Sequence, residues 1–98
     1  MFSITYRNNK LEKLAGGIGD YKFPQGIARR YRFVLSELEE MNTIQDILTR
    51  EGWRAERKKG DRADQIGIRL NDQRRLMIKP QGKTVEILLV WEVSKHYE

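Results

Sequence analysis

Cysteine is absent from the sequence and histidine occurs only once, at position 96. The absence of cysteine excludes disulfide bonds, thiol nucleophiles and cysteine-ligated zinc, and it fits a reducing compartment. A single histidine and scattered carboxylates without a recognisable ligand spacing do not make a metal site. We therefore expect a protein that works without a metal or another cofactor.

Long apolar runs are also missing. The N-terminal MFSITYRNNK lacks the apolar stretch of a signal peptide, and the longest apolar run, residues 87–91, is far too short to cross a bilayer. The sequence therefore predicts a soluble, cytoplasmic protein with no membrane partner.

What the sequence does contain fits one globular domain. Hydrophobic residues make up 39% and charged residues 34% of the chain, which is typical of a folded protein with a strongly solvated surface. A chain of 98 residues is long enough for one hydrophobic core and too short for two. We expect a single domain over residues 1–98, which must carry the function.

The charge is positive and unevenly distributed. Nineteen lysines and arginines stand against 14 acidic residues, giving a net charge of +5, which favours a polyanionic partner. Residues 52–75 contain eight basic and four acidic residues, so most of the excess lies in a quarter of the chain.

Helices are expected in the first half of the chain, after a short strand at residues 2–6. Asn8 or Asn9 can cap a short helix that carries Leu11 and Leu14 on one face. Apolar residues recur every three or four positions over residues 25–41, which predicts a long amphipathic helix. Asn42 followed by Gln45 resembles a cap for one or two further turns before Gly52.

The long helix has its charges in an unusual order. Arg29, Arg30 and Arg32 lie near its start and three glutamates lie near its end, the reverse of what the helix dipole favours. Either this is a solvated face, or an acidic protein covers it.

The second half of the chain changes to the alternation of strands. We expect strands at residues 53–58, 65–70, 74–79 and 84–93, joined by connections of hairpin length. The result is an α+β domain, with two N-terminal helices packed on one face of an antiparallel sheet.

Alternation also divides each strand between two faces. In the strand from Arg74, the side chains of Arg75, Met77 and Lys79 share one face. In the last strand we expect the helix-covered face to hold the apolar set, and we expect both tryptophans, Trp53 and Trp91, in the core. This set comprises Val85, Ile87, Leu89, Trp91 and Val93. The opposite face would then present cations from several strands to phosphates.

Several residues match what RNA cleavage without a metal requires. The reaction needs a base for the ribose 2′-hydroxyl, cations for the charge that grows on the phosphate, an acid for the leaving oxygen and an aromatic ring to hold a base. The cations expected to bind RNA are Arg54, Arg57, Lys58, Arg62, Lys79 and Lys95. Each of these features has a structural alternative. The basic run could be an ordinary solvated surface, His96 could be a surface histidine without a role, and Tyr97 could simply cover the edge of the sheet.

The chain resembles a known family over essentially its whole length. Its sharpest features are the KKGDR segment, an arginine opening the strand RLMI and a His-Tyr pair at the end. In their order along the chain, the segments ITYRNNKLEKL, ARRYRFVLSELEEM, GWRAERKKGDR, IGIRLNDQRRLMI and VWEVSKHYE resemble HigB-like (plasmid maintenance killer) members of the RelE/ParE toxin superfamily.

This resemblance implies a RelE-like fold and a ribosome-dependent mRNA endonuclease. It also implies a cognate helix-turn-helix antitoxin, through which alone the toxin would reach operator DNA. By position, Lys59 and Arg62 would contact RNA, Arg75 would stabilise the scissile phosphate, and His96 with Tyr97 would provide proton transfer and stacking. The sequence departs from the family at Glu56, where HigB-like enzymes often carry histidine, so Glu56 or His96 is the candidate base.

Two alternatives remain open. A ParE-like protein of the same fold would inhibit DNA gyrase instead of cleaving RNA. Because Glu56 departs from the family, a non-catalytic basic module that acts as co-repressor with its antitoxin is the other alternative.

Overall fold

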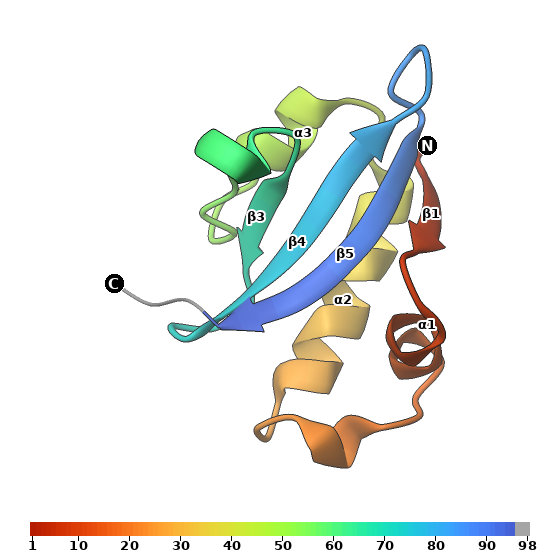
Figure 1. Ribbon diagram of the computed structural model, residues 1–98, viewed down its shortest axis with the longest axis vertical. Coiled ribbons are helices and arrows are strands. Elements are labelled where there is room, and N and C mark those ends of the chain that lie inside the picture. The colour runs from red at the N-terminus through yellow and green to blue at the C-terminus, as the bar shows by residue number, and fades with distance from the viewer. Residues whose placement is uncertain (96–98) are drawn as a thin grey trace.

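The computed structural model describes residues 1–95 of the chain, and it shows helices packed against one side of a curved sheet (Figure 1). Strand β1 (Ser3–Tyr6) is followed by helices α1 (Asn9–Ala15), α2 (Ile27–Glu40) and α3 (Ile44–Leu48). Strands β2 (Glu56–Arg57), β3 (Ile66–Arg69), β4 (Arg74–Gln81) and β5 (Ile87–Lys95) complete the chain, with short 3-10 turns at Asp20–Lys22 (η1) and Gly60–Arg62 (η2). The expected α+β class is confirmed.

The sheet has five strands in the order β1-β5-β4-β3-β2. The pairs β2–β3, β3–β4 and β4–β5 are antiparallel, as expected. Strand β1 pairs with β5 in parallel, with Ser3 opposite Ile87, so the sheet is mixed. The parallel pair is possible because α1 to α3 and three strands separate β1 from β5 and form a long crossover.

Helix α2 supplies most of the helical side of the core, as its periodicity predicts. Its buried side chains are Ile27, Ala28, Tyr31, Val34, Leu35 and Leu38. The hydroxyl of Tyr31 donates a 2.9 Å hydrogen bond to the Leu11 carbonyl of α1, and burial raises the pKa of Tyr31. This bond satisfies a buried polar group and fixes α1 against α2.

The cap of α3 and the first strand after it differ from the expectation. Asn8 caps α1, as expected, but the N-cap of α3 is Thr43, which forms a capping box with Asp46. The hydrogen bonds from the backbone amides of Asn42 and Thr43 hold the pKa of Asp46 below its usual value. The expected strand at 53–58 shortens to Glu56–Arg57, because Arg54 has a left-handed backbone (φ 46°) that interrupts an extended chain.

No helix among residues 1–95 is long and apolar enough to cross a membrane.

Trp53 is 1% exposed and lies in the core, as expected.

Candidate functional site

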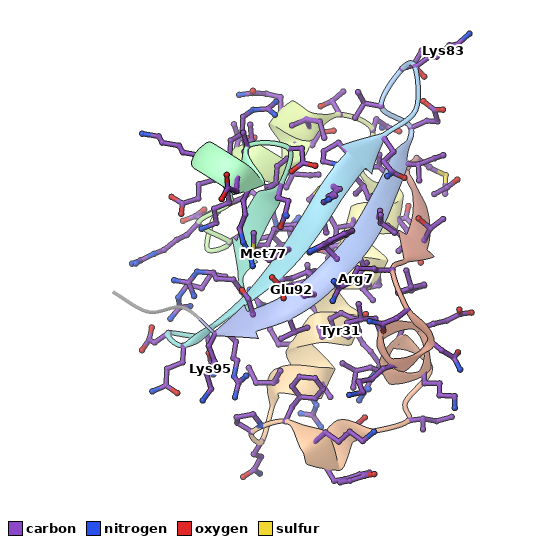
Figure 2. The ribbon with its side chains drawn as sticks, in the orientation of Figure 1. Arg7, Tyr31, Met77, Lys83, Glu92 and Lys95 are labelled. Atoms are coloured by element: carbon purple, nitrogen blue, oxygen red, sulfur yellow. The ribbon has the colours of Figure 1, made fainter. Side chains whose placement is uncertain are left out.

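The side of the sheet turned away from the helices, here called the open face, carries the candidate site. Figure 2 looks onto it, with Met77, Glu92 and Arg7 lying across strands β4 and β5 and the end of β1. Because Leu76 and Ile78 are buried against the helices, alternation turns Arg75, Met77 and Lys79 to the open face, as the sequence predicts.

Most of the last strand has the opposite orientation to the one expected, whereas Val93, paired with the buried Leu76, packs against the core as expected. Val85 lies in the turn before the strand. Leu88 and Val90 are fully buried in the core, whereas Ile87, Leu89 and Trp91 are only partly buried. The sequence ILLVW is apolar on both faces of the strand, so alternation does not determine which set lies inward. The prediction that Trp91 is a core residue is therefore wrong.

A β-bulge gives the open face two consecutive side chains of β5. Met77 pairs with Glu92 and Ile78 pairs with Val90, which leaves Trp91 as the extra residue. Glu92 lies opposite Met77 on the open face, and Trp91 contacts cations there: the Arg7 guanidinium is 4.5 Å and the Lys79 ammonium 3.5 Å from its ring centroid. Trp91 therefore holds Arg7 and Lys79 in place by cation–π contacts.

The loop between β2 and β3, residues 58–65, is fastened to the open face by ion pairs. Arg62 Nη1 lies 2.6 Å from Glu92 Oε1, and Asp64 Oδ2 lies 3.3 Å from Lys79 Nζ. Both pairs reach from the loop to strands beyond β3, so the loop lies across the sheet. A third pair, Lys58 Nζ to Glu56 Oε1 at 2.9 Å, joins the loop to β2.

The middle of the open face is filled rather than hollow. Met77 is 1% exposed, and Lys58 lies over Gly67 on the neighbouring strand. A Cβ atom at Gly67 would come within 2.7 Å of Lys58 Cε, so the glycine allows this close approach. The site is thus a surface of paired charges over an apolar centre.

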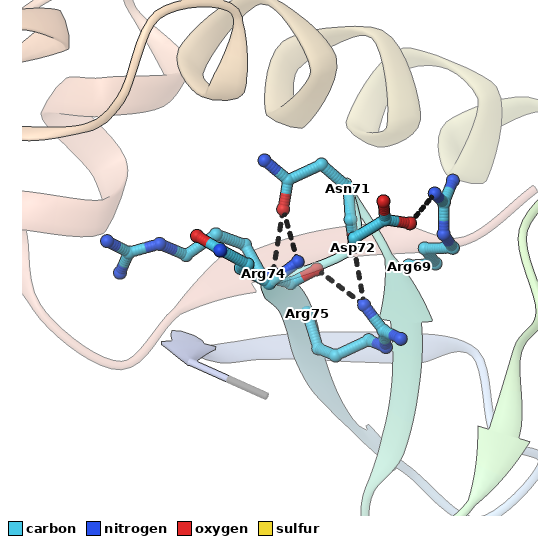
Figure 3. Close-up of polar contacts among 6 residues, drawn as sticks. Arg69, Asn71, Asp72, Arg74 and Arg75 are labelled. Atoms are coloured by element: carbon cyan, nitrogen blue, oxygen red, sulfur yellow. Dashed lines mark hydrogen bonds and ion pairs between the residues drawn. The ribbon is translucent and has the colours of Figure 1, made fainter. Parts of the chain in front are cut away.

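Arg75 is held at one end of this surface by the β3–β4 hairpin (Figure 3). Its Nη1 atom donates to the carbonyl oxygens of Asn71 (2.6 Å) and Arg74 (3.1 Å). The side chain of Asn71 in turn accepts from the backbone amides of Gln73 and Arg74, both at 2.8 Å. These contacts fix a partly buried guanidinium in one orientation, opposite Ser94 of β5.

Arg69 and Asp72 form a second polar contact at the same hairpin (Figure 3). The hydrogen bond from Arg69 holds the pKa of Asp72 below its usual value, so this carboxylate remains charged and neutralises Arg69. Arg69 therefore stabilises the turn.

The structure brings together some of the predicted site residues. Lys58, Arg62, Lys79 and Arg75 all lie on the open face, the first three as members of ion pairs and Arg75 at one end. Glu56 lies on β2 beside Gly67, with Lys58 as its ion-pair partner.

The remaining predicted residues are placed less centrally. Arg54, Arg57 and Lys59 are exposed, and within residues 1–95 the side chains of Arg57 and Lys59 form no ion pair or hydrogen bond. Lys95 is exposed and pairs in register with Arg74, whose Nε is buried without a hydrogen-bond partner. His96 and Tyr97 lie outside the described residues.

Sequence reasoning missed Glu92, Trp91 and Arg7. Glu92 supplies the open-face carboxylate that pairs with Arg62, and its Oε1 atom is buried. The only local signal was a charged residue inside an apolar strand, VWEV, which is unusual unless the charge has a partner. Among the described residues, no cluster of three or more histidine, cysteine, aspartate or glutamate side chains is arranged to hold a metal ion.

Comparison with solved structures shows that this chain shares its fold with two solved structures of toxin chains. A YoeB/ParE toxin from Agrobacterium tumefaciens superposes with a TM-score of 0.68 at 14% identity, over 99% of this chain and 100% of the other. A YoeB–YefM complex from Staphylococcus aureus superposes with a TM-score of 0.64 at 13% identity, over 99% of both chains. No protein-family model and no curated protein matches the sequence. At such low identity the likeness shows a common fold, and the RelE-like fold expected from the sequence is confirmed.

Proposed function

We propose that this chain is the toxin of a type II toxin–antitoxin pair and that it cleaves mRNA on the ribosome as a metal-independent endoribonuclease. Residues 1–98 would act as one HigB-like toxin domain in the cytoplasm. The RelE/ParE toxin fold and the gathering of cations on the open face support this function.

The observation that carries the proposal is the position of Arg75. Two backbone carbonyls fix its guanidinium on the open face, and the register sets it opposite Ser94, two positions before His96 in the sequence. A preorganised cation is what a phosphate requires as negative charge grows on it, because no reorganisation is needed during the reaction.

The chemistry then assigns a role to each group. A base, Glu56, His96 or the newly found Glu92, takes the proton of the ribose 2′-hydroxyl, whose oxygen attacks the neighbouring phosphorus. The bond to the 5′-oxygen breaks, and an acid returns a proton to that leaving oxygen. Arg75, Arg62 and Lys59 would stabilise the phosphate, and Tyr97 would stack on a base.

The remaining basic residues would hold the RNA backbone. Arg54, Arg57, Lys58, Lys79 and Lys95 surround the open face or its loop, and single-stranded RNA is commonly bound by such tracks of positive charge.

Induced expression of the full chain without a partner tests the function. We expect growth arrest and new mRNA 5′ ends in primer extension within minutes of induction, and expect neither from Arg75→Ala at equal protein level. Intact mRNA and normal growth with the wild-type chain would contradict the proposal.

Inhibition of DNA gyrase is the second candidate. It is favoured by the ion pairs of Lys58, Arg62 and Lys79, which neutralise cations that RNA cleavage would use. A gyrase inhibitor would induce the SOS response and alter plasmid supercoiling, and it would leave mRNA ends unchanged.

A cognate antitoxin is the expected protein partner. The fold likeness to a chain solved in a YoeB–YefM complex supports this expectation. A helix-turn-helix protein encoded beside this chain, co-purifying with it and repressing their shared operator, would establish the partner and its indirect contact with DNA.

A further inference from the structure

A group of basic residues without carboxylate partners lies away from the open face, around the loop that joins α1 to α2. Residues 9–33 contain six basic and two acidic residues. Within residues 1–95, Arg32 is the one member of these six that forms an ion pair, with Asp20. On the open face, by contrast, Lys58, Arg62 and Lys79 each have a carboxylate partner.

Exposed apolar side chains lie among these unpaired cations. Ile18 is 62%, Tyr21 86% and Phe33 44% exposed, and apart from Met1 they are the large hydrophobic side chains exposed in residues 1–95. We call the region formed by Ile18, Tyr21 and Phe33 with Lys22, Arg29 and Arg30 the tip surface. Exposed apolar groups gathered in one place usually mark an interaction site.

The tip surface is hollowed. One hollow of about 300 Å³ is lined by Ile18 and Tyr21, and a second of about 570 Å³ is lined by Tyr21 and Arg29. A third, of about 270 Å³, lies between Arg29, Arg30 and Phe33. Neighbouring hollows share Tyr21 or Arg29, so the three lie next to one another between α1 and the start of α2, and we call them together the strip.

An ion pair between Asp20 and Arg32 lines part of the second hollow and joins the elements around it. Arg32 donates to both carboxylate oxygens of Asp20, at 3.0 and 2.8 Å, and to the Leu14 carbonyl at the end of α1, at 3.0 Å. This clamp joins the loop to both helices and lowers the pKa of Asp20 through its hydrogen bonds from Arg32. A rigid strip loses little entropy when it binds a partner.

The charges on the strip select for an acidic partner. The first turn of α2 contains no acidic residue, and Arg29 and Arg30 add positive charge to the positive end of the helix dipole. In the unbound protein, these positive charges at the start of α2 destabilise that helix. A carboxylate beside the strip would relieve the repulsion and gain from both sources of positive potential.

We propose that the tip surface is the docking site for an acidic amphipathic helix of a partner protein, with apolar side chains in the hollows and carboxylates beside Lys22, Arg29 and Arg30. The aliphatic Ile18 and the apolar hollow at Phe33 favour a protein over a nucleic acid, because bases stack on aromatic rings and gain little from an exposed isoleucine. This surface is separate from the open face and would function whether or not the chain cleaves RNA.

A synthetic helical peptide of about 16 residues, with leucines at i, i+3, i+4 and i+7 and flanking glutamates, is the probe. Titrated into the full-length, isotope-labelled protein, it is expected to shift the amide resonances of Ile18, Tyr21, Lys22 and Phe33. The same peptide with lysine in place of glutamate is expected to leave them unchanged.

Matched charge reversals sharpen the test. Arg29→Glu is expected to weaken binding of the acidic peptide by roughly tenfold, while Lys83→Glu, in the β4–β5 turn at the far end of the molecule (Figure 2), is expected to leave affinity unchanged. Phe33→Ser, which removes the apolar contact and keeps the charges, should weaken binding as well.

Three results would overturn the proposal. One is the absence of shifts at the tip surface with the acidic peptide at about 1 mM, the weakest affinity of interest. Another is equal binding of the lysine peptide. The third is a response of Ile18, Tyr21 and Phe33 to oligouridine RNA and not to the peptide, which would assign the surface to nucleic acid.

Discussion

The open face and the tip surface of this protein differ in how many of their cations have carboxylate partners. On the open face, Arg62 and Lys79 are bound to Glu92 and Asp64, which also fasten the loop at residues 58–65 across the sheet. At the tip surface, Arg29 and Lys22 have no carboxylate partner within residues 1–95 and stand beside exposed apolar side chains. Net charge therefore does not distinguish the two regions, whereas the pairing of the individual charges does.

A cation in an ion pair is held in one orientation by its carboxylate, whereas a cation without such a partner is free to contact a binding partner. An ion pair holds a guanidinium in one geometry, which suits catalysis, but a phosphate must then compete with the carboxylate. An unpaired cation beside apolar groups suits recognition of an acidic protein surface. The two regions are thus suited to different partners.

The largest expected effect is from Arg75→Ala on the open face. Removing a preorganised cation should lower the rate of RNA cleavage by about 100-fold. RNA affinity should change far less, because Arg75 acts on the reacting phosphate. Single-turnover cleavage and anisotropy with labelled RNA measure the two quantities. Arg50→Ala, on the helical side, is the matched control, and an equal loss of affinity and rate would mean that Arg75 only binds.

A smaller effect is expected when a paired cation is made available. Glu92→Gln removes the charge that holds Arg62 and should tighten binding of a non-cleavable RNA by about threefold, with a steeper salt dependence. Glu86→Gln, a substitution of the same type in an exposed turn, should leave affinity unchanged. Loss of cleavage together with tighter binding would identify Glu92 as the base.

The substitution Arg29→Glu, which is expected to weaken binding of the acidic peptide, should make the free protein more stable. Arg29→Glu places an acidic residue in the first turn of α2 and should raise the free energy of unfolding by about 0.3–1 kcal/mol. Urea unfolding of the free protein measures this effect. A decrease would show that Arg29 already has a stabilising role in the unbound molecule.

The smallest effect is the acid dependence of the clamp between Asp20 and Arg32. The hydrogen bonds from Arg32 lower the pKa of Asp20 below its ordinary 3.8, so the folded state binds this proton more weakly than the unfolded state. The contribution of Asp20 to stability is therefore complete above about pH 5 and is lost as the pH falls through the lowered pKa. Urea unfolding at several pH values should show the difference between wild type and Asp20→Asn constant at neutral pH and shrinking below about pH 4. A stability difference that does not change with pH would show that the Asp20–Arg32 ion pair does not stabilise the folded protein.

Local periodicity was sufficient for most of the fold. The apolar spacing of α2 and the alternation around Ile66 and Ile68 predicted the buried faces, and Asn8 was a correct cap, because these signals depend on neighbours within one turn or one strand. The face of β5 could not be predicted, because both of its faces are apolar and the bulge at Trp91 depends on pairing with β4.

The candidate site was predicted only in part. The strand parity that turns Arg75 and Lys79 to the open face follows from the sequence. The pairs Arg62–Glu92 and Lys79–Asp64 join residues 30 and 15 positions apart, and no local pattern signals them. The tip surface was indicated only by the reversed charge order of α2, and its apolar component appeared once the exposure of Ile18, Tyr21 and Phe33 was known.

The separation of the two surfaces is tested most directly by mapping a short single-stranded RNA, with a 2′-O-methyl group at every position to prevent cleavage, onto the labelled full-length protein by NMR. Shifts are expected at Lys58, Arg62, Arg75 and Lys79, with Ile18, Tyr21 and Phe33 unaffected. Shifts confined to the tip surface, with the open face silent, would contradict the assignment of the open face to RNA.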